Sequence, residues 1–375
     1  MMRFNQMSNR ALDTKRILFM TDSLSNGGAE KVTATLANAL AKEKEYNVTI
    51  ACLRKDKNEY QVSENVETLY RESYKTNKYV EMISEFQYFK RIIKEHKPDV
   101  VISLAGYRTN IVLCLVEMFR KHSLIISDRS APSVYPKGRI FRFLRDITYN
   151  LPDGIVFQTN GACKYYKKRV QNKGIIIPNS VFVSEHHIKT RRNTVINCSR
   201  LEDVKNIDLL IDGFALISKD YPSYELEIFG QGYLENSLRN QAERLGIEKK
   251  VHFRGYKTNI EDEIYDGGIY VSVSKAEGLS NSMLEALALG IPTICTDCPD
   301  GGARMVIKSD FNGILIPVGD EESLVSAMKR IIDDRSFADR LSANAIESVK
   351  QYSPQRIAKM WKEYIEKVSY ERKQK

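Results

Sequence analysis

The stretch Ile269–Thr296 reads IYVSVSKAEGLSNSMLEALALGIPTICT. It begins with the apolar, β-branched run Ile269–Ser274, passes through a polar loop, continues as a helical pattern over Ser282–Leu289 and returns to a strand at Pro292–Thr296. A strand, a helix and a second strand in close succession are typical of a parallel βαβ unit. The stretch therefore predicts an α/β protein, with a polar loop at the carboxyl end of a strand, where parallel sheets bind ligands.

Short apolar runs alternate with helical patterns along the rest of the chain in the same way. The other predicted strands are Arg16–Thr21, Asn47–Leu53, Asp99–Leu104, Ser123–Ser127, Gly154–Thr159, Thr194–Ser199, Tyr224–Phe229, Val251–Phe253 and Gly313–Pro317. A polar, basic stretch, Val183–Asn193, interrupts the alternation. We therefore expect two doubly wound, Rossmann-like α/β domains, residues 1–182 and 183–353, that face each other across a cleft.

Length and composition agree with a two-domain globular protein. The chain has 375 residues, of which 42% are hydrophobic and 28% are charged, and this mixture excludes fibrous and disordered classes. The longest apolar run is Ile111–Val116, so no transmembrane helix is predicted. Residues 1–14 lack the apolar segment of a signal peptide and are expected to form a flexible tail. Six scattered cysteines fit the reduced thiols of a cytoplasmic protein.

Positive charge is concentrated in the first half of the chain. Residues 1–182 hold 30 Lys and Arg against 18 Asp and Glu, a net charge of +12, whereas residues 183–375 hold 27 against 30, a net charge of −3. This asymmetry predicts a basic surface for an anionic partner, which could be a nucleic acid, an acidic lipid or a phosphorylated substrate.

Two carboxylates flank the polar loop of the first stretch. Glu277 stands in the loop, and Glu285 lies about one turn inside the helix that follows it. Both side chains can face one pocket while the N-terminus of the helix faces a phosphate. A second interpretation of Glu285 is a capping box with Ser282, which needs no ligand, and Glu277 can be a solvated loop residue. Taken as one constellation, the two carboxylates favour a functional site.

Glycine-rich turns follow two other predicted strands, and each turn opens a helical pattern. Gly27 and Gly28 form the first turn, and Gly230 and Gly232 form the second. Glycine lets a ligand approach the backbone, and a helix N-terminus attracts anions. The alternative for both is an ordinary tight turn between strand and helix.

Two cations, Arg200 and Lys205, follow the predicted strand Thr194–Ser199. A pair of cations at the carboxyl end of a strand can balance a diphosphate, because arginine offers a bidentate fork and lysine a point charge. The alternative is ordinary surface charge.

Together these stretches resemble the retaining glycosyltransferases of GT-B fold in family 4, which assemble bacterial polysaccharides and lipid-linked glycans. The matching stretches, in chain order, are Gly27–Glu30, Ile177–Ser180, Ser199–Asn206, Phe229–Gly232, Gly255, Glu277–Pro292, and Asn312–Gly313 followed by Pro317. They extend over nearly the whole chain, so the resemblance indicates the family, although it does not name a sugar.

The resemblance implies that the C-terminal domain binds a nucleotide-sugar, expected to be a UDP-sugar, without a metal or another cofactor. Arg200 and Lys205 would neutralise the diphosphate and the charge that develops on it as it leaves. Glu277 would contact the donor sugar, and Glu285 would contact the ribose hydroxyls. Gly28 would donate its backbone N–H to the phosphate. The other donor-binding residues that the resemblance implies are Gly27, Gly230, Gly232, Gly278, Leu279, Ser280 and Asn281.

One position departs from the family pattern. Many relatives carry a histidine after the fifth strand, where this chain has Asp128 and Arg129. We expect one of these two residues to contact the donor or the acceptor in its place. The resemblance also implies that residues 354–375 form a helix that packs back on the N-terminal domain.

The basic segment 137–173 fits an acceptor-binding role. A helical stripe of apolar side chains runs through its first part: Ile140, Phe143, Leu144, Ile147 and Leu151. Such a helix can lie on an anionic membrane and attract a lipid diphosphate. The alternative is a helix packed in the domain core with its charged face in solvent. Arg142 and Arg145 are expected to turn away from the stripe, and the expected acceptor or membrane contacts are Arg139, Arg142, Arg145, Lys167, Lys168 and Arg169.

The sequence therefore predicts a cytoplasmic enzyme, peripheral to the inner face of the cell membrane. It would move a hexose or N-acetylhexosamine from a UDP-sugar to a lipid-linked glycan in capsule, exopolysaccharide or related biosynthesis, with retention of configuration. One alternative is a sugar-nucleotide epimerase of the same fold. Another is a nucleic-acid-binding protein that uses the basic half of the chain, which leaves the loops of the second half unexplained.

Overall fold

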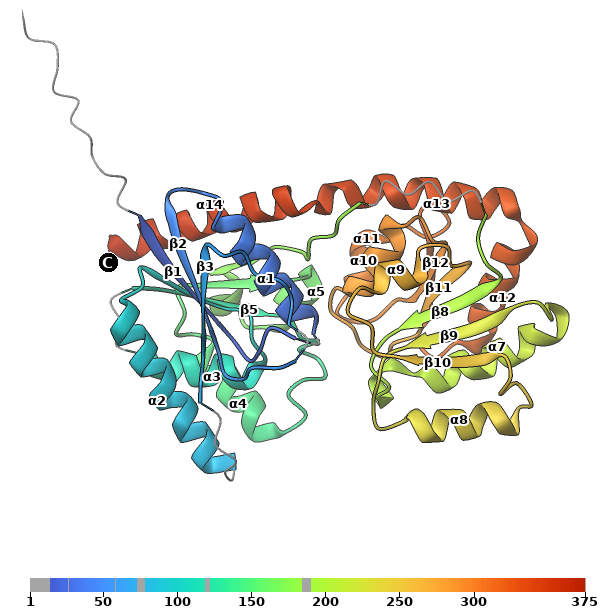
Figure 1. The fold of residues 1–375 in the computed structure, drawn as a ribbon, viewed down its shortest axis with the longest axis horizontal. Coiled ribbons are helices and arrows are strands. Elements are labelled where there is room, and N and C mark those ends of the chain that lie inside the picture. The colour runs from blue at the N-terminus through green and yellow to red at the C-terminus, as the bar shows by residue number, and fades with distance from the viewer. Residues whose placement is uncertain are drawn as a thin grey trace, which may run out of the picture. The chain divides into compact units, whose positions relative to one another are not determined.

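A computed structural model describes residues 14–25, 27–57, 59–72, 78–118, 122–183 and 190–374. Residues 1–13 of the predicted tail and residues 184–189 of the predicted linker lie outside this part of the chain. The chain divides into two compact units (Figure 1). Unit 1 contains the described residues of Met1–Ser127, Phe143–Ile155 and Ala358–Lys375, and unit 2 contains those of Asp128–Arg142 and Val156–Ile357.

Seven strands form the first sheet, in the order β3-β2-β1-β4-β5-β6-β7. They are β1 (Lys15–Thr21), β2 (Tyr46–Cys52), β3 (Val66–Tyr70), β4 (Val100–Ser103), β5 (Ser123–Asp128), β6 (Gly154–Phe157) and β7 (Gly174–Ile176). Strands β1 to β5 pair in parallel. The helices in this part of the chain are α1 (Gly28–Leu40), α2 (Lys78–His96), α3 (Tyr107–Val116), α4 (Arg139–Thr148), α5 (Asn160–Tyr165) and α6 (Lys168–Gln171).

Six strands form the second sheet, in the order β10-β9-β8-β11-β12-β13, and all neighbours pair in parallel. They are β8 (Thr194–Cys198), β9 (Glu225–Phe229), β10 (Val251–Gly255), β11 (Ile269–Ser272), β12 (Thr293–Thr296) and β13 (Ile314–Ile316). The helices are α7 (Ile207–Asp220), α8 (Glu235–Arg244), α9 (Ile260–Ile264), α10 (Asn281–Ala288), α11 (Gly302–Val306), α12 (Glu321–Asp333) and α13 (Arg335–Val349).

In each sheet the chain starts near the middle, moves to one side and then crosses to the other. The order turns at β1 in the first sheet and at β8 in the second, and loops that leave such a switch point diverge to form a crevice. The prediction of an α/β fold with two doubly wound parallel sheets is confirmed. The sequence pattern does not predict β3 or β7. Both are edge strands; β3 carries the adjacent polar residues Glu67 and Thr68, and β7 is only three residues long.

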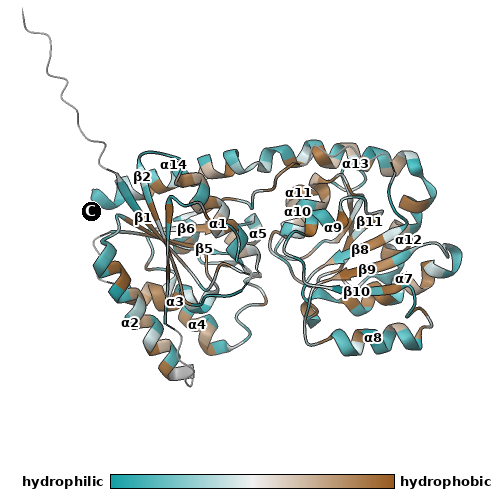
Figure 2. Ribbon diagram, in the orientation of Figure 1, coloured by the Kyte–Doolittle hydropathy of each residue, from teal (hydrophilic) through white to brown (hydrophobic). Residues whose placement is uncertain are grey.

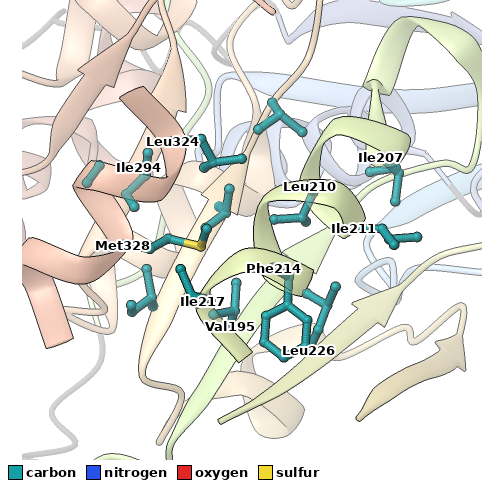
Figure 3. Close-up of a cluster of buried hydrophobic side chains, with 14 of the residues drawn as sticks. Val195, Ile207, Leu210, Ile211, Phe214, Ile217, Leu226, Ile294, Leu324 and Met328 are labelled. Carbon is teal, nitrogen blue, oxygen red and sulfur yellow. The ribbon is translucent and has the colours of Figure 1, made fainter. Parts of the chain in front are cut away.

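The core of unit 2 lies where α7 and α12 meet the second sheet (Figure 3). Leu210 and Phe214 of α7 are fully buried and belong to one cluster with Val195 of β8 and Leu226 of β9. They stand four residues apart, so one apolar stripe of the helix faces the strands. Figure 2 shows the strands of this sheet in hydrophobic colours, whereas α8 is mostly hydrophilic.

The last helix, α14 (Pro354–Lys373), contributes its residues from Ala358 onward to unit 1. Trp361 is completely buried, and the backbone N–H of Ile155 donates a hydrogen bond to Tyr364 Oη at 2.9 Å. Glu366 accepts from Tyr46 Oη at 2.8 Å and from Lys15 Nζ at 2.5 Å. These contacts fix α14 against β1, β2 and β6 within the unit.

Across the residues described, no helix combines the length and the apolar character needed to cross a bilayer. All six cysteines are free thiols.

We expect the Phe214→Ala substitution to lower the free energy of unfolding by about 3–5 kcal/mol, since a fully buried ring leaves a cavity that the core fills only in part. The matched control is Leu216→Ala on the same helix, where the side chain is 46% exposed and the change should stay within about 0.5 kcal/mol. Urea denaturation followed by circular dichroism measures both values. Equal losses in the two variants would contradict this description of the core.

Candidate functional site

The quoted stretch Ile269–Thr296 forms β11, the polar loop, α10 and β12, as its pattern predicts. Helix α10 begins directly after Ser280, whose hydroxyl accepts a hydrogen bond from the Met283 backbone N–H at 3.3 Å. Ser280 therefore caps the helix, and the alternative interpretation of Ser282 and Glu285 as a capping box is wrong.

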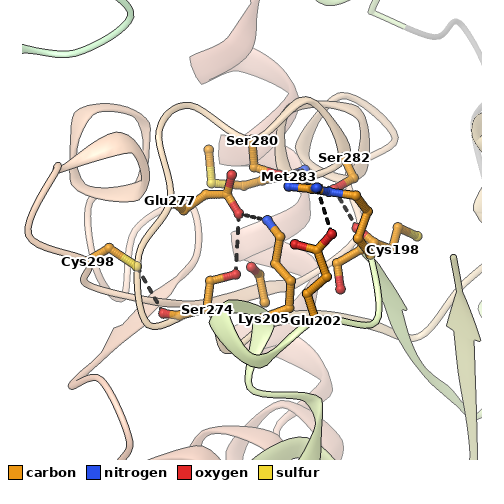
Figure 4. Close-up of polar contacts among 12 residues, drawn as sticks. Cys198, Glu202, Lys205, Ser274, Glu277, Ser280, Ser282, Met283 and Cys298 are labelled. Atoms are coloured by element: carbon orange, nitrogen blue, oxygen red, sulfur yellow. Dashed lines mark hydrogen bonds and ion pairs between the residues drawn. The ribbon is translucent and has the colours of Figure 1, made fainter. Parts of the chain in front are cut away.

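Glu277 and Lys205 form a close ion pair (Figure 4). Ser274 also donates a hydrogen bond to the Glu277 carboxylate at 3.3 Å. The Glu277 side chain is 26% exposed and the Lys205 side chain 13%. The ion pair is therefore largely shielded from water, while a ligand can still reach it. The loops after β8 and β11 thus bring together a cation and a carboxylate that the sequence analysis selected separately.

Arg200, the second predicted cation, has a different partner. Its guanidinium pairs with Glu202 at 2.7 Å, and its side chain is 63% exposed. The structure therefore does not place Arg200 and Lys205 on the same carboxylate. An exposed arginine with a long side chain can turn towards a phosphate without disturbing the core.

Glu285 is buried, with 6% of its surface exposed. Desolvation, and then the negative charge of Glu285, raise the pKa of the Cys198 thiol well above its ordinary value. The carboxylate of α10 therefore lies near the end of β8. Ser282, one turn earlier in α10, donates to the Cys198 carbonyl at 2.9 Å and lies 2.8 Å from Tyr270 Oη, which fixes the start of α10 against β8 and β11.

Gly230 and Gly232 allow the loops after β8 and β9 to pack closely. Gly230 has a φ of +140°, and a Cβ atom there would lie 1.9 Å from the Ser199 carbonyl oxygen. A Cβ atom at Gly232 would lie 2.2 Å from the Leu201 carbonyl oxygen. The Leu201 N–H donates to the Gln231 carbonyl at 3.0 Å. This packing requires both glycines whether or not a ligand binds, so their role in donor binding remains a prediction.

Asn179 connects four residues of unit 2. Its amide donates to the Leu279 carbonyl at 2.9 Å and to Asn281 Oδ1 at 2.5 Å. Its oxygen accepts from Gln158 Nε2 at 2.8 Å and from the Arg129 guanidinium. Asn179 is 2% exposed. The Asn179 side chain therefore holds Arg129 beside the loop that precedes α10. Arg129 stands where many relatives carry a histidine.

Asp128 is 3% exposed, and its carboxylate is held by hydroxyl groups. It accepts from Ser130 Oγ at 2.9 Å and from Tyr166 Oη. A second carboxylate, that of Asp300, accepts a hydrogen bond from Ser133 Oγ at 2.6 Å. Burial, together with the negative charge of nearby Asp128, raises the pKa of Asp300, although the hydrogen bond from Ser133 acts in the opposite direction. Because hydroxyl groups already occupy the Asp128 carboxylate, its contact with a donor or acceptor remains a prediction.

Gly278 sits in a tightly packed part of the loop. A Cβ atom on Gly278 would lie 2.7 Å from Gln158 Oε1, and a Cβ atom on Gly302 of α11 would lie 1.6 Å from the Gly278 carbonyl oxygen. The backbone at Gly278 is thus fixed from two directions, which places Glu277 precisely.

Gly27 and Gly28 lie at the start of α1 in unit 1, where Gly27 is the N-cap and Gly28 the first helical residue. Gly27 itself has no side chain that could cap this helix end. The Glu30 carboxylate lies over Gly27, at the place a Cβ atom would occupy. A role for these glycines in binding the donor phosphate remains a prediction.

Helix α4 directs its apolar stripe towards solvent. Ile140, Phe143 and Ile147 are 74%, 64% and 50% exposed, respectively. The alternative interpretation, in which this stripe packs in the domain core, is therefore wrong.

Two arginines of α4, Arg142 and Arg145, turn away from the stripe, as expected, but they turn into the protein. Arg145 is 1% exposed and donates twice to Asp146 Oδ1, at 3.1 and 3.0 Å. Its predicted contact with an acceptor or a membrane is wrong, because a buried guanidinium cannot reach either. Arg142 donates to the Pro136 carbonyl at 2.6 Å and supports the preceding loop. The exposed cations of the predicted set are Arg139, Lys167, Lys168 and Arg169.

Sequence reasoning did not select Asn179, Gln158 or Ser274 as site residues. Asn179 belongs to the stretch Ile177–Ser180, which already matches the family pattern, and this was a usable signal. Gln158 and Ser274 lie at strand ends and have no distinctive spacing, so their contacts appear only in the folded chain.

The sequence matches two family descriptions in succession. Residues 26–185 match "Glycosyltransferase Family 4", and residues 181–348 match "Glycosyl transferases group 1". The chain belongs to the glycosyltransferases of GT-B fold, with a family 4 domain followed by a group 1 domain.

The most similar relatives include enzymes of glycan assembly. An α-1,4-N-acetyl-D-galactosaminyltransferase of Campylobacter jejuni, whose name specifies an acceptor linked to undecaprenol through a diphosphate, is 28% identical over 361 residues, 94% of this chain and 99% of the relative. The amylovoran biosynthesis glycosyltransferase of Erwinia amylovora is 23% identical over 362 residues, 93% of this chain and 99% of the relative. Both of these relatives are thus glycosyltransferases of glycan or polysaccharide assembly.

Solved structures share the fold at low identity. HepE of Anabaena in complex with UDP and glucose is 16% identical and superposes with a TM-score of 0.79, covering 93% of this chain and 99% of that protein. Sucrose-phosphate synthase of Thermosynechococcus elongatus, also 16% identical, superposes with a TM-score of 0.80, covering 94% of this chain and 99% of that protein.

We expect the Asn179→Ala substitution to lower the free energy of unfolding by about 2–4 kcal/mol, because it leaves several buried partners without hydrogen bonds. The matched control is Asn193→Ala, where an exposed side chain bonds, among the residues that the structure describes, only to Ser223, at 3.1 Å. Urea denaturation measures the two losses. A loss at Asn179 no larger than the loss at Asn193 would show that this network does not fix the loop before α10.

Proposed function

We propose that this glycosyltransferase transfers a hexose or N-acetylhexosamine from a UDP-sugar to a lipid-linked glycan, in capsule, exopolysaccharide or related biosynthesis, with retention of configuration. The observation that carries the proposal is the Lys205–Glu277 pair, which stands at the carboxyl ends of β8 and β11. The complex of HepE with UDP and glucose and the undecaprenol-linked acceptor in the name of the Campylobacter jejuni relative support the choice of donor and acceptor.

In this proposal the cations receive the diphosphate. Lys205 supplies a charge that is already positioned by Glu277, and Arg200 swings from Glu202 to the second phosphate. Stabilising the charge that develops on the leaving diphosphate lowers the barrier to bond cleavage. When the donor binds, Glu277 contacts its sugar and Glu285 its ribose, while the diphosphate accepts the proton of the acceptor hydroxyl. Neither a metal ion nor another cofactor takes part.

Helix α4 supports a position at an anionic membrane surface, on the inner face of the cell membrane. Ile140, Phe143 and Ile147 form an exposed apolar face, and the neighbouring Arg139 is exposed as well. An apolar face next to positive charge favours the interface of a membrane that contains anionic lipids. The enzyme would there meet an acceptor that is anchored in the same membrane.

We expect the Arg200→Ala and Lys205→Met substitutions each to weaken UDP binding about tenfold or more, as the loss of a charge-assisted contact to phosphate requires. Thermal shift and calorimetric titration, both with EDTA present, measure the affinity. The matched control is Arg335→Ala, where an arginine with 71% exposure stands in α13, away from this loop cluster. No response to UDP, GDP or ADP in folded protein would contradict the proposed donor site.

We expect the wild-type chain to float with liposomes that contain anionic phospholipid, and the double variant Phe143→Ser, Ile147→Ser to bind them at least about tenfold more weakly, because two apolar anchors are lost. The control is Leu216→Ser, which removes an exposed apolar residue of α7. Liposome flotation at moderate salt measures the bound fraction. Failure of the wild-type protein to float would contradict the membrane assignment and leave the donor site untouched.

A further inference from the structure

Ser274 connects the Glu277–Lys205 pair to the end of strand β12. Its hydroxyl donates to Glu277 Oε2 at 3.3 Å, and Lys205 pairs with the same oxygen. The Ser274 carbonyl accepts two hydrogen bonds, one from Thr296 Oγ1 at 2.6 Å and one from Cys298 Sγ at 3.0 Å (Figure 4). A chain of hydrogen bonds therefore runs from the end of β12 through Ser274 to the carboxylate.

The two groups that donate to the Ser274 carbonyl lie inside the protein. Thr296 and Cys298 are both buried, and Cys298 Sγ also lies 3.5 Å from Thr296 Oγ1. Burial, together with the charge of Glu277, raises the pKa of the Cys298 thiol to about 11, although the hydrogen bond with Thr296 and the charge of Lys205 act in the opposite direction. The thiol therefore keeps its proton near neutral pH and can donate it. A carbonyl oxygen has two lone pairs, so it can accept from both groups.

Cys295 and Cys298 have the spacing C-x-x-C of a metal-binding pair, but a zinc site needs about four ligands. In the part of the chain that the structure describes, no group of three or more histidine, cysteine, aspartate and glutamate side chains is placed to hold a metal ion. Cys295 is buried in β12, and desolvation raises the pKa of its thiol. The contact with the Ser274 carbonyl is therefore the feature that distinguishes the Cys298 thiol.

The backbone after Ser274 is fixed from a second direction. The Lys275 N–H donates to the Val204 carbonyl at 2.8 Å, in the 3-10 turn η1 (Asp203–Lys205). This bond holds the loop after β11 against the turn that carries Lys205. The Ser274 hydroxyl is therefore not needed to keep the two loops together, and its bond to Glu277 sets the direction of the carboxylate.

Glu277 uses only one of its two oxygens in these contacts. Lys205 and Ser274 both bond to Oε2. Oε1 accepts no hydrogen bond from the residues that the structure describes, and it is not closed off from solvent. An ionised carboxylate oxygen is a strong acceptor, so Oε1 is available to a hydroxyl group of a ligand.

We propose that Thr296 and Cys298 position Glu277 for the donor sugar by acting through Ser274. The hydroxyl and the thiol hold the Ser274 carbonyl, and the Ser274 hydroxyl then holds Oε2 of the carboxylate. Oε1 is left to accept a hydrogen bond from a hydroxyl of the sugar. The inference rests on the proposed transfer from a UDP-sugar, in which Glu277 contacts the sugar, and it adds the residues that orient this contact.

The test compares two affinities of the full-length chain, one for UDP and one for a UDP-sugar, by calorimetric titration with EDTA present. The probes are UDP-glucose, UDP-galactose, UDP-N-acetylglucosamine and UDP-N-acetylgalactosamine, and the one that the wild-type chain binds most tightly is used for the variants. We expect Ser274→Ala to weaken UDP-sugar binding about tenfold, because the carboxylate loses a charge-assisted hydrogen bond, and to change UDP binding by less than about twofold. Cys298→Ala and Thr296→Val should each weaken UDP-sugar binding about threefold, since the carbonyl keeps one donor.

Conservative and matched variants separate positioning from a loss of stability. Cys298→Ser and Thr296→Ser keep a donor at each position, so both should bind the UDP-sugar as the wild-type chain does. The matched control is Thr293→Val at the other end of β12, where a buried hydroxyl donates to the Ile291 carbonyl at 2.8 Å. Thr293 has no contact with Ser274, so the ratio of the two affinities should not change.

A double-mutant cycle tests the route from the thiol to the carboxylate. If the thiol acts through the Ser274 hydroxyl, then adding Cys298→Ala to Ser274→Ala weakens UDP-sugar binding no further. Three results would overturn the proposal: the two losses add, Ser274→Ala weakens UDP and the UDP-sugar equally, or Thr293→Val changes the ratio as much as Thr296→Val.

The same titrations separate this inference from the donor site itself. If the wild-type chain binds UDP and a UDP-sugar but their ratio is equal in all variants, the donor site stands and only the positioning role fails. If the folded wild-type chain binds neither UDP nor any of the four UDP-sugars, the proposed donor site fails and this inference fails with it.

Discussion

The parallel pairing of the strands is the constraint on which the chemistry depends. In a parallel sheet every strand ends at the same edge, so residues from distant parts of the sequence meet there without any further device. In unit 2 this edge collects Lys205 after β8, Gly230 after β9 and Glu277 after β11. The core that α7 and α12 form with the strands keeps the edge in register. In unit 1 the same rule collects the charged residues after β1, β2 and β3.

Close backbone packing and buried amide hydrogen bonds then convert this rough proximity into defined geometry. Gly278 and Gly302 let two loops touch with no room for a side chain, and Asn179 uses its amide on both sides, as donor to Leu279 and Asn281 and as acceptor from Gln158. Such contacts fix the loop that carries Glu277 before a substrate arrives. When charge develops during the reaction, polar groups that are already in place do not have to reorient. The free-energy cost of reorganising the site is therefore smaller.

Much of the fold could be predicted from the sequence, because β-branched runs and helical periodicity are local signals. The same signals do not reveal edge strand β3, where two adjacent polar residues interrupt the apolar run. They also do not show which serine caps α10, since Ser280 and Ser282 both suit a cap. For α4 the same signals predict that the apolar side chains share one face, which is correct. Periodicity cannot tell which face of a helix is turned to solvent, and for this reason the burial of Arg145 was not predicted. Asn179 and Cys298 gain their roles from partners that only the folded chain brings near them. No rule of residue spacing along the sequence predicts which backbone carbonyl a buried polar side chain will meet.

The assembly of unit 1 from segments that lie far apart in the sequence has a consequence for recombination among relatives. The unit is assembled from three separate segments, and the last of them, Ala358–Lys375, follows the second by about 200 residues of sequence. It supplies Trp361, Tyr364 and Glu366, which pack on or bond to the first two segments. A crossover in the middle of the gene would therefore join one parent's strands to another parent's terminal helix. Chimeric enzymes should therefore carry all three segments of unit 1 from the same parent.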